Sequence, residues 1–372
     1  MNGPKMLSKP PQSKEAIEQR LDELKLKYGD WAYDIPLPYG IWTRGNLQKP
    51  HTRLKRIVQI ANDLCDKPLS ACRVLDLGCL DGIFSIEFAL QGATTIGVEI
   101  REANIQKALF CKEVLGLDNL EFRQDDVRNV SLESYGEFDV ILCSGILYHL
   151  PAFDAIDLIR KMYEMATRIV IIDTHISLFP EEEIRFDDHS YWGDSYREHS
   201  DGASVEDKAK RLWASIDNET SFWFTRPSLV NLISKAGFSS VYECFVPPNF
   251  IPSMHFQDAG IRAHDRCTFV AMKDHDCELN TSPTANKLRQ EWPENSLAYG
   301  TPRPAAKSAQ AAQLAELSRQ HAEILNSKAW KLVLILRRMR LTFFPPGSRR
   351  ERLAQALLKP VLRYLQKESQ RQ

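Results

Sequence analysis

The sequence lacks any long apolar segment. None of its 372 residues falls in an uninterrupted apolar stretch of about 18 residues, the length that a membrane-spanning helix requires. Residues 1–27 are polar and charged, so we expect no signal peptide and predict a cytoplasmic protein. The eight cysteines include no Cys-x-x-Cys pair, so we expect buried thiols rather than disulfides or zinc ligands. The predicted core elements contain Cys79, Cys111, Cys143 and Cys244.

Net charge is also nearly absent, at −1, but this balance conceals two oppositely charged parts. Residues 303–372 contain fifteen Lys or Arg and four Glu, so this tail carries +11 and the other 302 residues carry −12. An acidic body with a basic tail is not the pattern of a protein that binds nucleic acid across its main surface. The tail could pair with a helical protein partner, lie on an anionic membrane surface or bind RNA phosphates. RNA is the least favoured, because aromatic residues are sparse there.

Composition and periodicity divide the chain into four parts. Residues 1–70 are predicted to form N-terminal helices and an aromatic arm, and residues 71–273 a doubly wound α/β domain. An insertion at about 179–222 is rich in acidic and aromatic residues and is expected to form a lid over the ligand site. Residues 274–304 contain four prolines and no apolar periodicity, which predicts a linker. Residues 305–372 have helical spacing and form the basic tail.

Residues 74–84 contain the pattern that indicates most about the fold. An apolar run breaks into a turn and then resumes with helix-forming residues. Gly78 lets the backbone turn sharply and approach a ligand, and Gly82 leaves the helix start without a Cβ. A second apolar run, at 94–98, ends in Glu99, an acid placed to accept hydrogen bonds from ribose hydroxyls. This order is the opening unit of a doubly wound sheet.

The stretch Asp-Leu-Gly-Cys-Leu-Asp-Gly at 76–82 resembles the first motif of the class I S-adenosylmethionine-dependent methyltransferases, except that Leu80 replaces a usual third glycine. The variant Gly-Cys-x-Asp-Gly-x-Phe-Ser is similar to a branch that includes the tRNA wobble-uridine (carboxy)methyltransferases and their small-molecule and glycan relatives. Residues 125–127 and 138–144 resemble the family's later motifs, in the right order. The resemblance covers about residues 30–273. It implies a Rossmann-like, doubly wound, mostly parallel sheet of seven strands.

The resemblance also implies S-adenosylmethionine as the cofactor. Glu99 would bind the ribose, Asp126 would accept from the adenine amino group, and the backbone amide of Val127 would donate to the ring. A dinucleotide-dependent oxidoreductase fits less well, because it gives no role to Asp76 or to the acidic pair at 125–126. The cofactor site that the resemblance implies comprises Asp76, Gly78, Cys79, Asp81, Gly82, Glu99, Asp126, Val127, Ser144 and Tyr148.

The segment after the fourth strand bears on what is methylated. Residues 143–150 read Cys-Ser-Gly-Ile-Leu-Tyr-His-Leu, in place of the Asn/Asp-Pro-Pro-Tyr type of motif that amino-group and adenine methyltransferases use. The Gly-x-Leu-Tyr-His run resembles many O- and C-methyltransferases. It makes His149 a candidate general base for a hydroxyl, because imidazole exchanges protons near neutral pH. The alternative is a structural histidine at a strand end. Asp173 and His175, at the end of the fifth strand, are candidates to orient or replace it.

Two segments of the chain leave alternatives open. Residues 31–45 contain two prolines and two glycines, so they cannot form a regular helix. They resemble a segment that closes over the substrate side in related small-molecule methyltransferases, but they could equally pack their aromatic rings on the core. Asp-Asp-His at 187–189 and the His-x-Asp at 199–201 bring metal-ligand types together. Acidic lids are usually solvated, and the Asp/Asp/Asn set of the catechol-type family is absent, so we expect no metal site.

Residues 327–338 and 345–352 of the basic tail resemble tails of bacterial cell-surface polysaccharide glycosyltransferases and associated proteins. With the methyltransferase motifs, this favours an O-methyltransferase for a hydroxyl of a sugar, glycan or related metabolite in polysaccharide biosynthesis. The expected partners are this small-molecule or glycan acceptor and, through the tail, a protein or the inner membrane surface. The alternatives are a tRNA wobble-uridine modifying enzyme and an inactive methyltransferase-fold scaffold.

Overall fold

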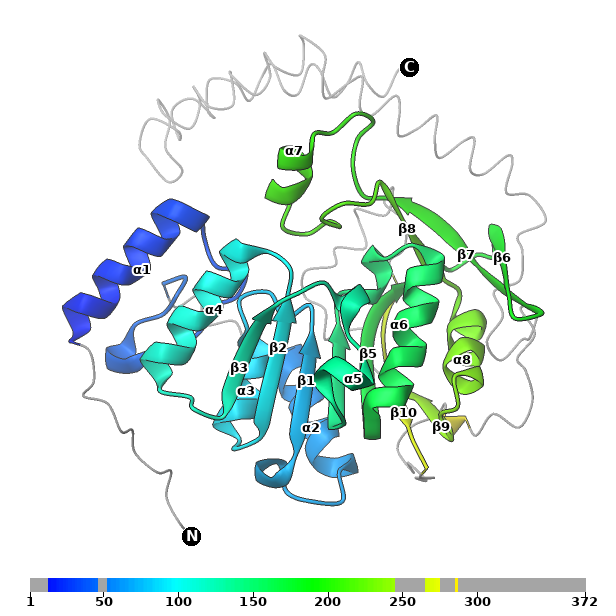
Figure 1. The fold of residues 1–372 in the computed structure, drawn as a ribbon, viewed down its shortest axis with the longest axis horizontal. Helices are drawn as coiled ribbons and strands as arrows, with labels where there is room; N and C mark the ends of the chain where they lie inside the picture. Colours follow the sequence, from blue (N-terminus) through cyan, green and yellow to red (C-terminus); the bar gives the residue numbers. More distant parts are fainter. Residues whose placement is uncertain (1–12, 46–51, 245–264, 275–284, 287–372) are drawn as a thin grey trace, which may run out of the picture. The chain divides into compact units, whose positions relative to one another are not determined.

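The computed structural model describes residues 13–45, 52–244, 265–274 and 285–286, and an eight-stranded sheet forms its centre (Figure 1). Its strands are β1 (Arg73–Leu77), β2 (Thr94–Glu99), β3 (Leu120–Gln124), β4 (Phe138–Ser144), β5 (Ala166–Ile176), β9 (Ser240–Glu243), β10 (Asp265–Met272) and β11 (Ala285–Asn286). They are ordered β11-β9-β10-β5-β4-β1-β2-β3. Neighbours from β5 to β3 pair in parallel, whereas β10 is antiparallel to both β5 and β9.

Helices pack on both faces of this sheet because alternate side chains of its strands are apolar on both sides. In β1, Leu75 and Leu77 belong to one buried cluster and Val74 to another. The first cluster includes residues of α6 and α8, and the second includes residues of α1 to α4. The helices are α1 (Lys14–Tyr28), α2 (Thr52–Leu64), α3 (Ile83–Leu90), α4 (Glu102–Leu115), α5 (Leu132–Tyr135), α6 (Ala152–Met165), α7 (Val205–Lys210) and α8 (Arg226–Lys235).

The predicted doubly wound fold is confirmed, with two differences of detail. β5 continues to Ile176, so Asp173 lies within the strand rather than at its predicted end, because β10 pairs along β5 from Ile169 to Ile176. β11 lies within the predicted linker and pairs with β9, so this part of the linker adds a short edge strand. The strand order reverses at β1, which lies between β2 and β4. The crevice at the carboxyl ends of these strands is where doubly wound sheets bind ligands.

The predicted lid insertion forms a second, smaller sheet. Its strands β6 (Glu182–Phe186), β7 (His189–Arg197) and β8 (Thr220–Phe224) are antiparallel. Phe222 and Phe224 of β8 are buried in the cluster that contains α6 and α8, which attaches this sheet to the domain. Between β7 and β8, the chain forms α7 and then an irregular segment whose Ala214 carbonyl accepts a hydrogen bond from Arg101, just after β2. The insertion therefore reaches the crevice.

The aromatic arm at 31–45 is largely buried. Trp31 and Ile35 are only 2% and 1% exposed, and they pack in the cluster beside α1 to α4. The backbone N–H of Tyr33 donates to Asp81 Oδ2 at 2.8 Å, which ties the arm to the turn after β1. The arm thus packs on the core, as one of the two predicted alternatives has it, and it also brings Tyr33 to the crevice.

Several predicted parts lie outside the described residues. They are residues 1–12, most of the linker at 274–304 and the whole basic tail at 305–372. The chain divides into two units, Met1–Arg303 and Pro304–Gln372, and the predicted domain bounds stay predictions. Among the helices that the structure describes, none is long and apolar enough to cross a membrane.

Candidate functional site

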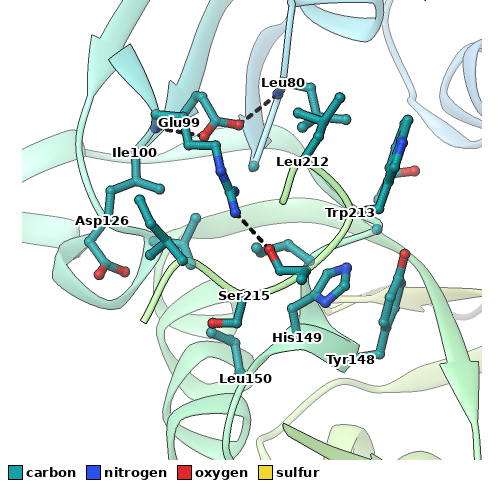
Figure 2. Close-up of a pocket in the computed structure, with 18 of the residues that line it drawn as sticks. Leu80, Glu99, Ile100, Asp126, Tyr148, His149, Leu150, Leu212, Trp213 and Ser215 are labelled. Atoms are coloured by element: carbon teal, nitrogen blue, oxygen red, sulfur yellow. Dashed lines mark hydrogen bonds between the residues drawn. The ribbon is translucent and has the colours of Figure 1, made fainter. Parts of the chain in front are cut away.

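A cavity of about 240 Å³ lies at the carboxyl ends of β1, β2 and β4. Glu99 and Ile100, at the end of β2, form one part of its wall, and Tyr148 and His149 form another (Figure 2). Leu212, Trp213 and Ser215 of the insertion also line it, and the role of the insertion as a lid stays a prediction. The predicted site residues that line the cavity are Gly78, Glu99, Asp126, Val127, Ser144, Tyr148 and His149.

Glu99 holds the two loops beside the cavity. Its Oε2 accepts from the Leu80 N–H at 3.1 Å and its Oε1 accepts from the Arg101 N–H at 2.8 Å (Figure 2). Burial raises the pKa of this carboxyl above its usual range, although the Arg101 N–H and its positive charge oppose the shift. A carboxylate has about four acceptor positions, so these two hydrogen bonds leave room for hydroxyl donors of a ligand.

Two features beside Glu99 suit a polar ligand held close to the backbone. Gly78 has φ +67, and a Cβ there would lie 3.0 Å from the Ile146 Cβ, so a side chain at this turn would be strained and would crowd Ile146. The Ser144 Oγ, at the end of β4, is buried and has no hydrogen-bond partner among the residues that the structure describes. Buried hydroxyls are nearly always hydrogen-bonded, so this oxygen indicates a ligand group that is absent here.

In the acidic segment at 125–127, Asp126 already has a side-chain partner. Asp126 accepts from the Arg128 N–H, Nε and Nη2, at 2.9, 2.9 and 2.5 Å. The same guanidinium reaches Asp217 of the insertion at 2.5 Å. These hydrogen bonds raise the pKa of Arg128, although its burial opposes the shift. Arg128 therefore competes with adenine for Asp126, and it fastens the insertion to this segment.

Four predicted cofactor residues do not line the cavity. Asp76 is 1% exposed and accepts from Ser85 Oγ at 2.6 Å, and Asp81 is fully buried against the Tyr33 N–H. The Cys79 thiol is buried, and the backbone N–H of Cys79 donates to the Val98 carbonyl at 2.9 Å. A Cβ at Gly82 would lie 2.6 Å from the Phe122 ring. The other predicted cofactor residues come together, whereas Asp76, Cys79, Asp81 and Gly82 form the frame behind them.

Asp76, one of these buried acids, should make the free energy of unfolding depend on pH. Burial raises the pKa of Asp76 to about 7, although hydrogen bonds from Ser85 oppose the shift. The unfolded value is about 3.9, so the folded state holds this proton more tightly and loses stability as pH rises from about 4 to 7. Asp76→Asn should therefore increase the free energy of unfolding at pH 8 by about 1–4 kcal/mol, and much less at pH 4. Urea unfolding at the two pH values measures this, and a gain that is larger at pH 4 would contradict it.

His149 forms a pair with Glu198, a residue that the sequence did not single out. Its Nδ1 lies 2.9 Å from Glu198 Oε1, and the Glu198 side chain is 1% exposed. Glu198 also accepts from Ser221 Oγ at 2.7 Å and from the Ser215 N–H at 3.0 Å. Burial alone would raise the pKa of Glu198, but the hydrogen bonds from His149, Ser221 and Ser215 hold it below the usual range. Glu198 is therefore an anionic acceptor for the imidazole.

The pairing determines what His149 can do. Because a carboxylate only accepts, Nδ1 of a neutral His149 carries the proton and Nε2 presents its lone pair. His149 lines the cavity between Ser215 and Tyr148 (Figure 2). A histidine oriented by a buried carboxylate in a ligand cavity is the arrangement of a general base.

Asp173 has surroundings that suit a structural role. Its two oxygens lie 2.6 Å from Arg266 Nε, 3.4 Å from Arg53 Nη1 and 3.3 Å from Arg56 Nη2. Burial would raise the pKa of Asp173, but the charges of Arg266 and Arg53 outweigh burial and hold it below its usual range. A carboxylate held ionised by three guanidiniums is a weak proton acceptor. Asp173 also does not line the cavity.

His175 also contacts neighbouring side chains and does not line the cavity. Its ring stacks on Trp223 at a centroid distance of 5.0 Å and meets Tyr148 edge-on at 4.6 Å. Its Nε2 lies 3.4 Å from Arg266 Nη1. Of the three predicted catalytic residues, only His149 lines the cavity.

The residues that the structure describes contain no cluster of candidate metal ligands. Within 13–45, 52–244, 265–274 and 285–286, no three His, Cys, Asp or Glu side chains gather so that they could hold a metal ion. In the predicted insertion, His199 Nε2 lies 2.7 Å from the Ser215 carbonyl and Asp201 pairs with Arg197 at 2.9 Å.

A family model described as a methyltransferase domain matches residues 68–213. This stretch therefore resembles a methyltransferase domain. Two curated relatives are both named ubiquinone biosynthesis O-methyltransferase. The one from Acinetobacter baylyi is 32% identical over 83 residues, which is 22% of this chain and 35% of that protein. The one from Pseudomonas putida is 37% identical over 97 residues, 26% of this chain and 40% of that protein. The chain thus covers well under half the length of these relatives.

A solved structure extends the likeness beyond the matched domain. The N-terminal domain of EvdMO1, crystallised in the presence of SAH and D-fucose, aligns over 71% of this chain and 97% of its own, with a TM-score of 0.53 and 22% identity. The same domain with SAH bound aligns over the same shares, with a TM-score of 0.52 and 23% identity. At this identity the likeness is one of fold, and it agrees with the predicted fold class.

Proposed function

We propose that this protein is an S-adenosylmethionine-dependent O-methyltransferase whose acceptor is a hydroxyl of a sugar, glycan or related small metabolite. The observation that carries the proposal is the His149–Glu198 pair, which presents an oriented imidazole to the same cavity that Glu99 lines. The D-fucose and SAH in the EvdMO1 crystals, and the O-methyltransferase names of the curated relatives, support it. A cavity of about 240 Å³ suits a small acceptor better than a tRNA loop.

The described residues fit the cofactor. Glu99 has acceptor positions for ribose hydroxyls, and the orphaned Ser144 Oγ can bond a polar group of the amino-acid portion. Gly78 permits the turn that brings the backbone after β1 to the cavity wall. Asp126 can reach adenine only while sharing its oxygens with Arg128. When bound, S-adenosylmethionine supplies an activated methyl group on a sulfonium.

The protein's own part is to position and deprotonate the acceptor. His149 Nε2 accepts the hydroxyl proton, and the buried Glu198 carboxylate stabilises the imidazolium that results. Leu212 and Trp213 of the insertion line the same cavity and give it an apolar part. The cytoplasmic location and the binding of the basic tail to a partner or membrane remain predictions.

Calorimetry with the full-length protein tests the cofactor. S-Adenosylhomocysteine should bind with micromolar affinity, and NAD should bind far more weakly because Glu99, Asp125 and Asp126 in the cavity wall would repel its pyrophosphate. Absence of S-adenosylhomocysteine binding, or tighter binding of NAD, would overturn the proposal.

A further inference from the structure

Beyond the proposed reaction, the cavity has a second recognition feature, at the residues around Asp173. This one carboxylate is shared by three guanidiniums, those of Arg53, Arg56 and Arg266, and by Thr268 Oγ1 at 2.7 Å. Three positive charges against one negative charge leave a cationic cluster in a partly buried place. Such an excess is costly in low dielectric unless an anion offsets it.

Two of the three arginines line the cavity. Arg266 donates through Nε to Asp173 and through Nη1 to the Tyr148 hydroxyl at 3.3 Å. Its Nη2 is buried and hydrogen-bonds to no described group. Arg53 donates through Nη2 to the Tyr33 hydroxyl at 2.6 Å, and both residues line the cavity. Arg56 instead donates through Nη2 to Thr268 and Asp173, and it does not line the cavity.

The opposite part of the wall has the opposite charge. Glu99, Asp125, Asp126 and Asp217 line it, with Arg101 and Arg128 among them. A ligand group with ribose hydroxyls and a cationic sulfonium is better placed among these acids than beside Arg53 and Arg266. The cationic cluster is therefore available to the other substrate. Tyr148 connects it to the proposed base, because its ring lies 4.2 Å from that of His149.

We propose that the acceptor carries a carboxylate or phosphate group, which Arg53 and Arg266 bind, so that a neighbouring hydroxyl meets His149. The inference rests on the proposed function. A planar guanidinium with free N–H groups recognises either anion, and a charge-assisted hydrogen bond is about twice as strong as a neutral one. The acceptor class is then an acidic or phosphorylated sugar or a similar hydroxylated acid, rather than a neutral sugar.

The test compares galactose, galacturonate and galactose 1-phosphate as probes of the full-length protein loaded with S-adenosylhomocysteine. Calorimetry should show at least one of the two anionic probes binding about tenfold or more tightly than galactose. Arg266→Gln and Arg53→Gln should each remove most of this preference. Arg56→Gln is the matched control: it removes the same charge from the same carboxylate, but outside the cavity wall, and should keep the preference.

The melting temperature and the affinity for S-adenosylhomocysteine are measured for every variant. Arg53 is the safer substitution, because Asp173 then keeps the closer Arg266 as well as Arg56. Equal binding of all three probes, including no binding, overturns the proposal, and so does an equal loss in Arg56→Gln. A folded Arg53 or Arg266 variant that loses S-adenosylhomocysteine affinity assigns the cluster to the cofactor's carboxylate, which also overturns it. If the wild type binds no S-adenosylhomocysteine, the proposed function fails, and the anion preference is read from the unloaded protein.

Discussion

Replacement of His149 by alanine is expected to lower turnover by about 10²–10⁴-fold. The imidazole is the group in the cavity wall that a buried carboxylate orients for proton transfer, through the 2.9 Å contact of Nδ1 with Glu198. Affinity for S-adenosylhomocysteine should change little, because Glu99 and Gly78, which are expected to bind the cofactor, line the opposite part of the wall. Initial rates of S-adenosylhomocysteine release, with calorimetry of the same variant, measure the two quantities.

Glu198→Gln provides the graded variant of this experiment. A glutamine amide would satisfy the Ser215 N–H with its oxygen and turn its NH₂ toward His149, which favours the tautomer with a proton on Nε2. Turnover should fall by about tenfold or more, yet less than in His149→Ala, and the double variant should be no slower than His149→Ala. His175→Ala is the comparison in β5. Loss of turnover in His175→Ala with full activity in His149→Ala would move the base to the fifth strand.

The sheet and the position of the cavity follow from local patterns. Apolar residues in consecutive positions of β1 predict a strand buried on both faces, and the glycines after it predict the turn at the ligand crevice. Glu99 ends β2 and lines the cavity because parallel strands end at the same edge of the sheet. These features depend on residues within one strand–turn–helix unit, so the sequence contains them.

The pairings that decide the chemistry are not local. Glu198 meets His149 across 49 positions of the chain, because the Phe222 N–H of β8 donates to the Leu150 carbonyl and docks the insertion beside that turn. The arginines around Asp173 come from α2, 120 and 117 positions away, and from β10, 93 positions away. Its position at the predicted end of the fifth strand made Asp173 a candidate base, and only tertiary contacts show that its charge is already shared. Hydrophobic periodicity predicts helices and strands, but it does not predict which polar side chains will pair.

Glu99→Ala is expected to weaken the binding of S-adenosylhomocysteine by about 1–3 kcal/mol, or 5- to 150-fold in Kd. The substitution removes the carboxylate that ribose hydroxyls would use and leaves their donors without a partner. It also removes the acceptor of the Leu80 and Arg101 N–H groups, so the loops themselves could shift. Affinity loss alone therefore does not distinguish a direct ribose contact from a tether between loops.

A ligand that lacks the hydroxyls separates the two causes. Calorimetry should compare S-adenosylhomocysteine with its 2′-deoxy analogue on the wild type and on Glu99→Ala. If Glu99 accepts from the ribose, the wild type prefers the hydroxylated ligand by about tenfold or more, and Glu99→Ala loses that preference, because a charged acceptor contributes about 1.5–3 kcal/mol per hydrogen bond. If Glu99 only ties Leu80 to Arg101, both ligands lose affinity by the same factor and the preference survives. That second outcome would leave the acid at the end of β2 as part of the frame, and would move ribose recognition to another residue of the cavity wall.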